Sequence, residues 1–330
     1  MKLAPSSLAL AAVLALAAGT ATAGQLHVFT SDAAGFNTHS VWYDDGQEIT
    51  VVDTQFTPAQ AEALLADIRR QSASPVTRVI VTHPNPDKFN ALSVFHKAGA
   101  DSIASAKAAA ALPAVDRYKR YFFVNIAKAF TDETYPKVEP VKTTYSGRMV
   151  IKLKSGETLT LIELPHAGIS SNQTVVRIDK TGDLVVGDLV HNHTHAWLEG
   201  GIVDGKPAPD LAGWKTDLAE LPKLGGGTVY GGRGRFVPVA QAVAEQTAYL
   251  DQAQAIVDCY IGMLSGDRAR ELTDPALQSR HHAALQDAFT KAFPDYAMPE
   301  LIGYSIYGLV AQRLAHIDSA PSHERKNCMP

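Results

Sequence analysis

Cysteine is scarce in this sequence. The 330 residues include two cysteines, Cys259 and Cys328, and neither lies in the paired spacing of a structural zinc site. A disulfide-dense scaffold is therefore excluded, since such folds are held by several bridges. Whether the two cysteines form one bridge or stay as thiols is left open, because connectivity cannot be derived from sequence.

An excess of basic charge is also missing. The chain has 30 Lys and Arg against 34 Asp and Glu, a formal net charge of −4, and contains no basic run. Nucleic-acid binding domains usually carry a basic patch or stripe, so we expect no nucleic-acid partner.

Long apolar runs are absent beyond the first residues. There, Lys2 precedes an apolar run from Leu8 to Ala18, and Ala21-Thr22-Ala23 has the small-x-small pattern of a cleavage site. This pattern predicts a secretory signal peptide. The run is shorter than the roughly 20 residues that span a bilayer. We expect a mature protein from Gly24 that is secreted or periplasmic, with no membrane contact after signal cleavage.

Two common catalytic motifs are missing. No Gly-x-Ser-x-Gly surrounds Ser170 or Ser171, which excludes a nucleophile elbow there. The Gly-rich run 225–234 lacks the Lys-Ser/Thr of a phosphate-binding loop. What the chain does have is a globular composition, 46% hydrophobic and 19% charged, which predicts a large core.

Strands and helices alternate through the first two thirds of the chain. Strands are expected at 25–30, 39–43, 48–53 and 76–82, and a helix capped by Thr57 and Pro58 is expected to run to about Gln71. Further strands are expected at 138–153, 158–164, 173–178, 183–187 and 227–230. Apolar strands interspersed with amphipathic helices predict an α/β (α+β) fold with helices covering sheets.

Chemically active side chains follow several of these strands. The loop after the strand 76–82 places His83, Asn85 and Asp87 at alternate positions, stiffened by two prolines. His166, Asp188 and Arg233 each follow a later strand. Because strand ends are where distant segments of layered α/β folds converge, we expect these side chains to meet in one site.

The loop resembles that of the metallo-β-lactamase-fold hydrolases, which has the pattern His-x-His-x-Asp-His. The resemblance covers about Gly24 to Phe236 and implies an αββα sandwich, two mixed sheets between helical layers. The family's seven ligand positions fall, in chain order, on His83, Asn85, Asp87, Lys88, His166, Asp188 and Arg233. Four keep the family's residue type; Asn85, Lys88 and Arg233 replace histidines.

The resemblance divides the chain into three parts: a signal peptide at 1–23, a metallo-β-lactamase-like domain at 24–236, and a C-terminal helical extension at 237–330. Helices are expected at 237–264, 275–292 and 299–315. The extension is predicted to be either a cap on the substrate side or a surface through which a homodimer forms.

The family's reaction is zinc-assisted hydrolysis, in which the metal lowers the pKa of a bound water. Here the resemblance implies a reduced, mononuclear zinc site formed by His83, His166 and Asp188, with the Asn85 oxygen as a weak fourth ligand. Asp87 would orient or deprotonate the water. The implied substrate is a small anionic ester, lactone, lactam or phosphoester.

Two cations stand where the second zinc would be bound. Arg never deprotonates in proteins and cannot be a metal ligand. We therefore hypothesise that Lys88 and Arg233 replace the second metal by pairing with Asp87 and Asp188. Arg233 would alternatively bind an anionic substrate group. Lys88 would be a catalytic base if burial lowered its pKa.

Two interpretations stay open. The protein is either an exported metal-dependent hydrolase or a non-catalytic member that binds a small anionic ligand or a partner protein, because fold does not imply function. The run His191, His193 and His195 is likewise open. Alternation in an extended segment would turn the three rings to one side, so one of them would replace a lost ligand. Otherwise they rim the pocket, with His193 and His195 contacting substrate.

Overall fold

The computed structural model describes residues 24–264 and 266–317. The predicted signal peptide and Cys328 lie outside the described residues, so export and the pairing of the cysteines stay predictions. Within the described ranges, no helix is both long and apolar enough to cross a lipid bilayer.

The first sheet has six strands in chain order: β1 (Gln25–Thr30), β2 (His39–Asp44), β3 (Ile49–Val52), β4 (Val76–Ile80), β5 (Asp101–Ser105) and β6 (Thr143–Tyr145). β1, β2 and β3 pair antiparallel, and β3 to β6 pair parallel. The parallel connections run through helices, as parallel pairing requires.

The second sheet has the order β14-β13-β10-β9-β8-β7. Its strands are β7 (Arg148–Lys152), β8 (Thr158–Glu163), β9 (Thr174–Ile178), β10 (Leu184–Asn192), β13 (Thr228–Gly234) and β14 (Val237–Pro238). β7 to β10 pair antiparallel, whereas β10 and β13 pair parallel. A separate hairpin is formed by β11 (Gly201–Val203) and β12 (Lys206–Ala208).

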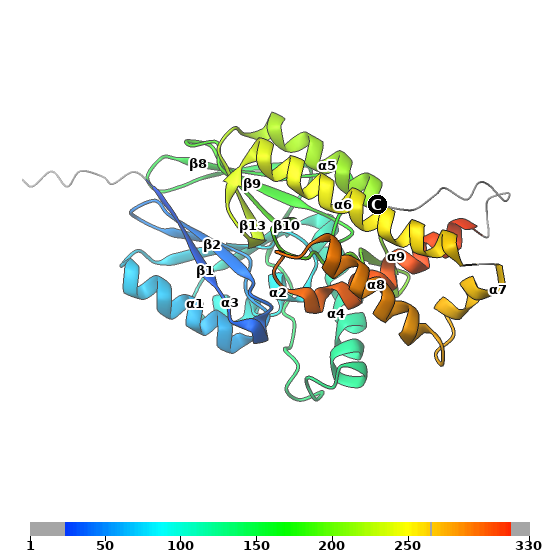
Figure 1. Ribbon diagram of the computed structural model, residues 1–330. Coiled ribbons are helices and arrows are strands. Elements are labelled where there is room, and N and C mark those ends of the chain that lie inside the picture. Colours follow the sequence, from blue (N-terminus) through cyan, green and yellow to red (C-terminus); the bar gives the residue numbers. More distant parts are fainter. Residues whose placement is uncertain (1–23, 265, 318–330) are drawn as a thin grey trace, which may run out of the picture.

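Three hydrophobic clusters define four layers. One lies between the sheets, where Val41 and Ile80 of the first sheet share a cluster with Leu161 and Val176 of the second. A second joins the first sheet to the helices α1 (Pro58–Gln71), α3 (Leu92–Lys97) and α4 (Ala106–Tyr121). In Figure 1, α1 and α3 lie on one side of the strands and the helices α5 and α6 on the other. The predicted αββα sandwich is confirmed.

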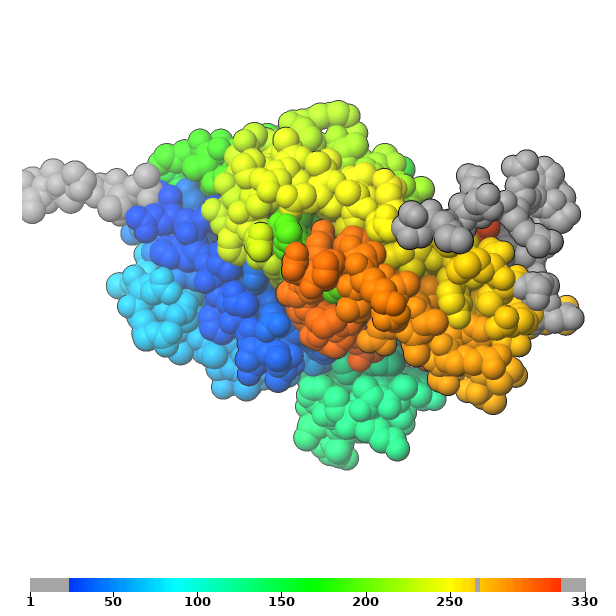
Figure 2. All heavy atoms as spheres, viewed as in Figure 1, coloured from blue at the N-terminus to red at the C-terminus, as the bar shows by residue number. Residues whose placement is uncertain are grey.

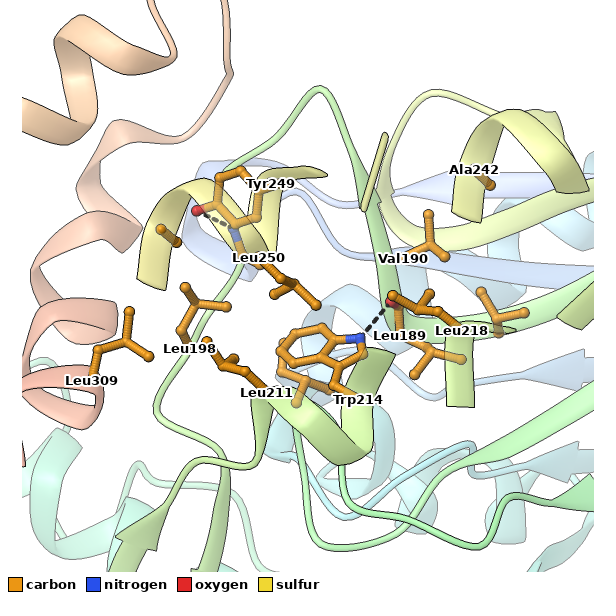
Figure 3. Packing of buried hydrophobic residues seen from close by; sticks show 14 of the residues in the cluster. Leu189, Val190, Leu198, Leu211, Trp214, Leu218, Ala242, Tyr249, Leu250 and Leu309 are labelled. Carbon is orange, nitrogen blue, oxygen red and sulfur yellow. Dashed lines mark hydrogen bonds between the residues drawn. The ribbon is translucent and has the colours of Figure 1, made fainter. Parts of the chain in front are cut away.

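The third cluster packs the second sheet against α5 (Leu211–Leu224) and the C-terminal helices α6 (Val239–Met263), α8 (Gln278–Ala292) and α9 (Ile302–Ile317). Figure 3 shows Trp214 at its centre, with the indole Nε1 donating to the Leu189 carbonyl at 2.9 Å. Because one continuous core contains strand β10 and the helices α6, α8 and α9, these C-terminal helices are part of the sandwich's own packing.

The predicted start of the helix α1 is confirmed. Thr57 caps α1 through a capping box with Gln60, and Pro58 occupies the first turn. Ser105 caps α4 by accepting from the Ala108 amide. The shorter helices α2 (Pro86–Phe89) and α7 (Gly266–Ala269) complete the set described.

Some expected bounds were wrong. The helix α4 ends at Tyr121, and a π-helical turn, η2, covers Phe122–Ile126. Strand β10, expected to end at Gly187, continues to Asn192, and β13 continues to Gly234. The added residues of the two strands pair with one another: His191 pairs with Arg233, and Asn192 pairs with Gly234. Such pairing between distant segments is invisible to local periodicity.

Candidate functional site

Four charged side chains meet in a closed ring between the two sheets: Asp87, Lys88, Asp188 and Arg233, here called the ion quartet. Lys88 Nζ lies 2.8 Å from Asp87 Oδ2 and 2.8 Å from Asp188 Oδ1. The Arg233 guanidinium lies 2.9 Å from Asp87 Oδ2 and 2.7 Å from Asp188 Oδ2. Each cation therefore pairs with both carboxylates, as the hypothesis of electrostatic pairing predicted.

Three separate segments supply the ion quartet. The loop after β4 turns at Asn85, and Pro86 at the first helical position starts the one-turn helix α2, which holds Asp87 and Lys88. β10 supplies Asp188 and its parallel neighbour β13 supplies Arg233. The quartet thus joins the first sheet's loop to the second sheet.

Two glycines allow this close approach. A Cβ at Gly232 would lie 1.8 Å from Asp188 Oδ1 and 3.0 Å from Lys88 Nζ. Gly187 has φ +51°, and a Cβ there would lie 2.4 Å from Thr82 Oγ1. Any larger side chain at either position would force the loop after β4 away from β10, because packed interiors leave no room for it.

The quartet is buried and its charges support one another. The side chain of Lys88 is fully buried, and those of Asp188 and Asp87 are 3% and 8% exposed. Burial raises the pKa of Asp188, but the Arg233 and Lys88 charges outweigh burial and hold this pKa well below its ordinary value. Burial opposes the charge of Lys88, yet Asp188 and Asp87 raise its pKa. These contacts favour the charged form of Lys88 and argue against its role as a base, which stays untested.

Arg233 also donates hydrogen bonds to the segment that precedes β2. Its Nε donates to the Phe36 carbonyl at 2.8 Å, and Nη2 donates to Thr38 Oγ1 at 2.9 Å as well as to Asp87. Thr38 Oγ1 in turn lies 3.0 Å from Asp87 Oδ2. All three guanidinium nitrogens are thus used within the protein, which argues against the alternative role of Arg233 as an anion-binding fork.

Two imidazoles flank Asp188. His83 Nε2 lies 3.6 Å from Asp188 Oδ2, and His191 Nε2 lies 3.5 Å from Oδ1. His191 Nδ1 lies 3.2 Å from the His195 carbonyl, which only accepts, so Nδ1 carries the proton and donates. His83 Nδ1 contacts Thr82 Oγ1, whose own proton points to Asp53. Both buried Nε2 atoms have no hydrogen-bond partner in the described part of the chain.

A pocket opens directly above the quartet. Asp87, Asp188, Arg233 and Asn85 lie at its base. Its walls are mainly aromatic, and they come from segments far apart in the sequence: Phe36, Phe56, Phe123, Trp197 and Leu301. About 410 Å³ of atom-free space lies between these walls, part of it open to solvent.

Comparison with known protein families shows which family this chain belongs to. The family model of the metallo-β-lactamase superfamily matches residues 33–233. The chain belongs to the metallo-β-lactamase superfamily. Its members share a hydrolase-type fold, and the matched span contains every residue of the ion quartet.

Solved metallo-β-lactamases share the fold at low identity. One from Pontibacter korlensis is 16% identical, with a TM-score of 0.52, over 70% of this chain and 95% of its own. FIM-1 from Pseudomonas aeruginosa, solved in a mono-zinc form, is 13% identical, with a TM-score of 0.50, over 70% and 91%. DIM-1, exposed to ceftazidime, is 17% identical, with a TM-score of 0.51, over 70% and 94%.

Metallo-β-lactamases typically use zinc, so the donor set here must be compared with that use. Lys88 and Arg233 stand at two of the family's ligand positions. Both form ion pairs with the Asp87 and Asp188 carboxylates, which would otherwise bind the metal ion. Among the residues that the structure describes, no three His, Cys, Asp or Glu side chains are placed to hold a metal. The side chains as arranged do not fit a zinc centre.

The other predicted ligands are divided between two places. Asn85 lines the pocket beside the quartet. His166 is exposed, lies next to Gly213 at the start of α5, and its amide contacts Asp217. No hydrogen bond or ion pair joins the His166 ring to the quartet within 24–264 and 266–317. A metal site formed by His83, His166 and Asp188 therefore stays a prediction without support from these contacts.

The three alternating histidines do not turn to one side, contrary to the expectation from sequence. The His191 ring lies beside Asp188 of the ion quartet. In contrast, His193 has φ +54° and packs on Tyr296, with 5.3 Å between the ring centroids. His195 is buried against Tyr249 and Phe293. The left-handed turn at His193 breaks the alternation. His193 and His195 contact the C-terminal helical region and do not line the pocket; their contact with substrate stays untested.

Sequence reasoning missed the aromatic walls and the supports of the quartet. Phe36, Phe123 and Trp197 belong to no motif in the sequence. Thr38 and Asp53 were also missed, although Asp53 directly follows the strand β3, with φ +68°, beside the site. A polar residue at a strand end was a signal that applied to Asp53 as much as to Asp188.

Proposed function

We propose that this metallo-β-lactamase superfamily protein binds a small organic ligand in the pocket above the ion quartet, without a metal pair as its working centre. The observation that carries the proposal is the closure of the quartet: Lys88 and Arg233 each join both Asp87 and Asp188. The cations stand where metal ligands are expected and use the carboxylates that an ion would need.

Charge energetics support this proposal. To bind zinc through Asp87 and Asp188, the protein would have to separate four buried salt-bridge contacts and leave two cations uncompensated. Breaking one buried pair costs about 3–5 kcal/mol, and Arg233 cannot relieve the cost by losing its proton. The quartet therefore favours the metal-free arrangement.

The proposed catalytic roles of Asp87 and Lys88 find little support in the same geometry. The pKa of Asp87 is lowered: the charges of Lys88 and Arg233 outweigh the effect of burial, which would raise it. A carboxylate held this way is a weak base, since general bases work best with a pKa near the operating pH. With Lys88 held as a cation, neither residue is poised to activate a water.

A second candidate is a hydrolase with one zinc ion, and a specific observation favours it. The unpartnered Nε2 atoms of His83 and His191 both face Asp188, and each ring is oriented through its Nδ1. Imidazoles held in this way are typical of metal ligands. This candidate requires Asp188 to leave its salt bridges, and its substrate would be a small ester, lactone, lactam or phosphoester.

Metal content separates the two candidates. The protein is purified without chelator or histidine tag, dialysed against micromolar zinc and then metal-free buffer, and analysed by mass spectrometry of the elements. We expect well under 0.1 zinc per chain. Two zinc ions per chain would refute the proposal. One zinc per chain, lost in His191→Ala but kept in the control His193→Ala, would establish the second candidate instead.

Export to the periplasm or the extracellular space belongs to the same proposal, based on the sequence pattern of residues 1–23. Mass spectrometry of the protein from the periplasmic fraction tests it, with cleavage before Gly24 expected. The C-terminal helices fit the role of a pocket cap, because Leu301 lines the pocket and Tyr304 stacks on Trp197 at 4.2 Å. A homodimer through these helices is tested by the mass of the particle in solution.

A further inference from the structure

The charges around the pocket cancel, and this decides what kind of ligand fits it. The ion quartet has two positive and two negative groups. Lys119, which also lines the pocket, is bonded to Glu199. Glu199 additionally accepts from Tyr118 Oη at 2.6 Å and from Trp197 Nε1 at 2.8 Å. Every charge in contact with the pocket therefore has a partner of opposite sign.

A charged ligand would gain little here. It would lose its hydration on entering, and the residues facing it offer no uncompensated counter-charge, so its desolvation would not be offset. Lys119 is further occupied by the Trp197 ring, whose centroid lies 4.4 Å from Nζ. An uncharged ligand avoids this cost.

The walls of the pocket are aromatic rings that pack on one another. Phe36, Phe56 and Phe123 pack mutually, with centroids 5.1 to 6.0 Å apart, and Trp197 meets Phe36 edge-on at 6.3 Å. Phe123 projects from the π-helical turn η2; such turns occur frequently at functional sites. Aromatic pairs with these edge and offset geometries gain energy beyond burial alone, which favours an aromatic guest over an aliphatic one.

The C-terminal region closes the pocket on its remaining side. Phe122 of η2 contacts Tyr304 of α9 at 5.4 Å, and Leu301 lines the pocket. Figure 2 shows the C-terminal helices meeting the segment around α4 on the molecular surface. The ligand is thus held between the sandwich and its C-terminal helices.

One polar group at the base is available to the ligand. Asn85 is partly buried, lines the pocket, and its side-chain amide makes no hydrogen bond within the described residues. An amide offers both a donor and an acceptor. It complements a carbonyl, hydroxyl or carboxamide on the edge of a ring.

From these observations we infer that the pocket binds an uncharged, planar aromatic compound with a hydrogen-bonding group at one edge. The ring lies against the wall formed by Phe36, Phe56, Phe123 and Trp197, and the polar edge meets Asn85. This inference rests on the proposed function and names its ligand class. It replaces the anionic ligand expected from sequence, because the charges of Lys88 and Arg233 are already compensated.

Three matched probes test the inference: 2-naphthamide, 2-naphthoate and 2-naphthamidinium, which share a shape and differ in charge. Their dissociation constants are measured by calorimetry on protein whose zinc content has been determined. We expect the neutral amide to bind at least tenfold more tightly than either ion. Preferential binding of the naphthoate, or no binding of any probe at millimolar concentration, would overturn the inference.

Variants place the probe in the pocket. Phe123→Ala and the gentler Phe123→Leu should weaken naphthamide binding at least fivefold, whereas Tyr121→Ala, two residues away and 61% exposed, should not. Asn85→Leu should reduce the preference for the amide over unsubstituted naphthalene. Equal effects of the Phe123 and Tyr121 variants would overturn the site. The zinc content tests the proposed function separately, so a failure of the ligand class leaves a metal-free centre standing.

Discussion

Replacing Lys88 by methionine tests the ion quartet most directly. The side chain of Lys88 is fully buried and lies 2.8 Å from both Asp87 and Asp188. Methionine retains much of its length but removes the charge. Arg233 is then left as the single counter-charge for two buried carboxylates.

The expected cost follows from that imbalance. Removing one partner from a buried ion pair typically costs about 3–5 kcal/mol, because the remaining charge is left uncompensated. A natural protein has a total stability of roughly 5–15 kcal/mol, so Lys88→Met should remove a large fraction of it. The assay is urea unfolding at pH 7, followed by far-ultraviolet circular dichroism.

A surface pair on α8 provides the matched control. Lys291 lies 2.7 Å from Asp287, with side chains 75% and 63% exposed, and exposed helix pairs contribute about 0.3–0.5 kcal/mol. Lys291→Met should therefore hardly move the unfolding midpoint. If Lys88→Met moved it no more than Lys291→Met does, the argument that the quartet is a tightly coupled buried unit would be refuted.

A second variant isolates charge from packing. In Lys88→Met combined with Asp87→Asn, one of the two carboxylates becomes neutral, so Arg233 again faces a single negative charge. We expect the double variant to regain at least about 1 kcal/mol relative to Lys88→Met alone, since residues in one network are not additive. Additive losses would mean that the cost arises from shape and not from charge.

Three further variants test the metal positions and the pH dependence. Lys88→His with Arg233→His restores imidazoles at two family ligand positions, and should take up at least one zinc per chain by elemental analysis; a folded protein without zinc would contradict this. Burial raises the pKa of Asp53 to about 6, so the native state binds this proton more tightly than the unfolded state and stability falls as pH rises from about 4 to 6. Asp53→Asn, which tolerates the left-handed backbone, should remove that fall in urea midpoints. Burial lowers the pKa of His39 to about 4, so the stability that the neutral imidazole contributes is lost as pH falls from 6.5 to 4. The variant His39→Gln should keep its stability in that range. A pH profile of the unfolding midpoint unchanged from that of the unsubstituted protein would contradict the burial argument.

Much of the fold followed from local signals. The capping residue Thr57 starts its helix in the structure, and the strand before His83 lies where its apolar residues predicted. Such features depend on neighbours along the chain, namely side-chain caps and alternating burial, so a single sequence contains them.

The site was predictable in part. That Lys88 and Arg233 would pair with Asp87 and Asp188 was a hypothesis from the resemblance, which places two cations and two carboxylates at the family's ligand positions. The length of β10 was not predictable, because its last residues extend by pairing with β13. That extension places His191 beside Asp188 and leaves His193 and His195 elsewhere.

The residue types at the loop after β4 were enough to indicate the family and the loss of its usual metal ligands, since each side chain's charge and donor atoms are properties of the residue itself. The folded chain alone determined that each cation contacts both carboxylates and that Phe36, Phe123, Trp197 and Leu301 line one pocket. These residues are separated by long stretches of chain, and their meeting depends on how the sheets, η2 and the C-terminal helices pack. Burial and charge balance arise from that packing, and they are what changes the expected ligand from an anion to a neutral aromatic compound.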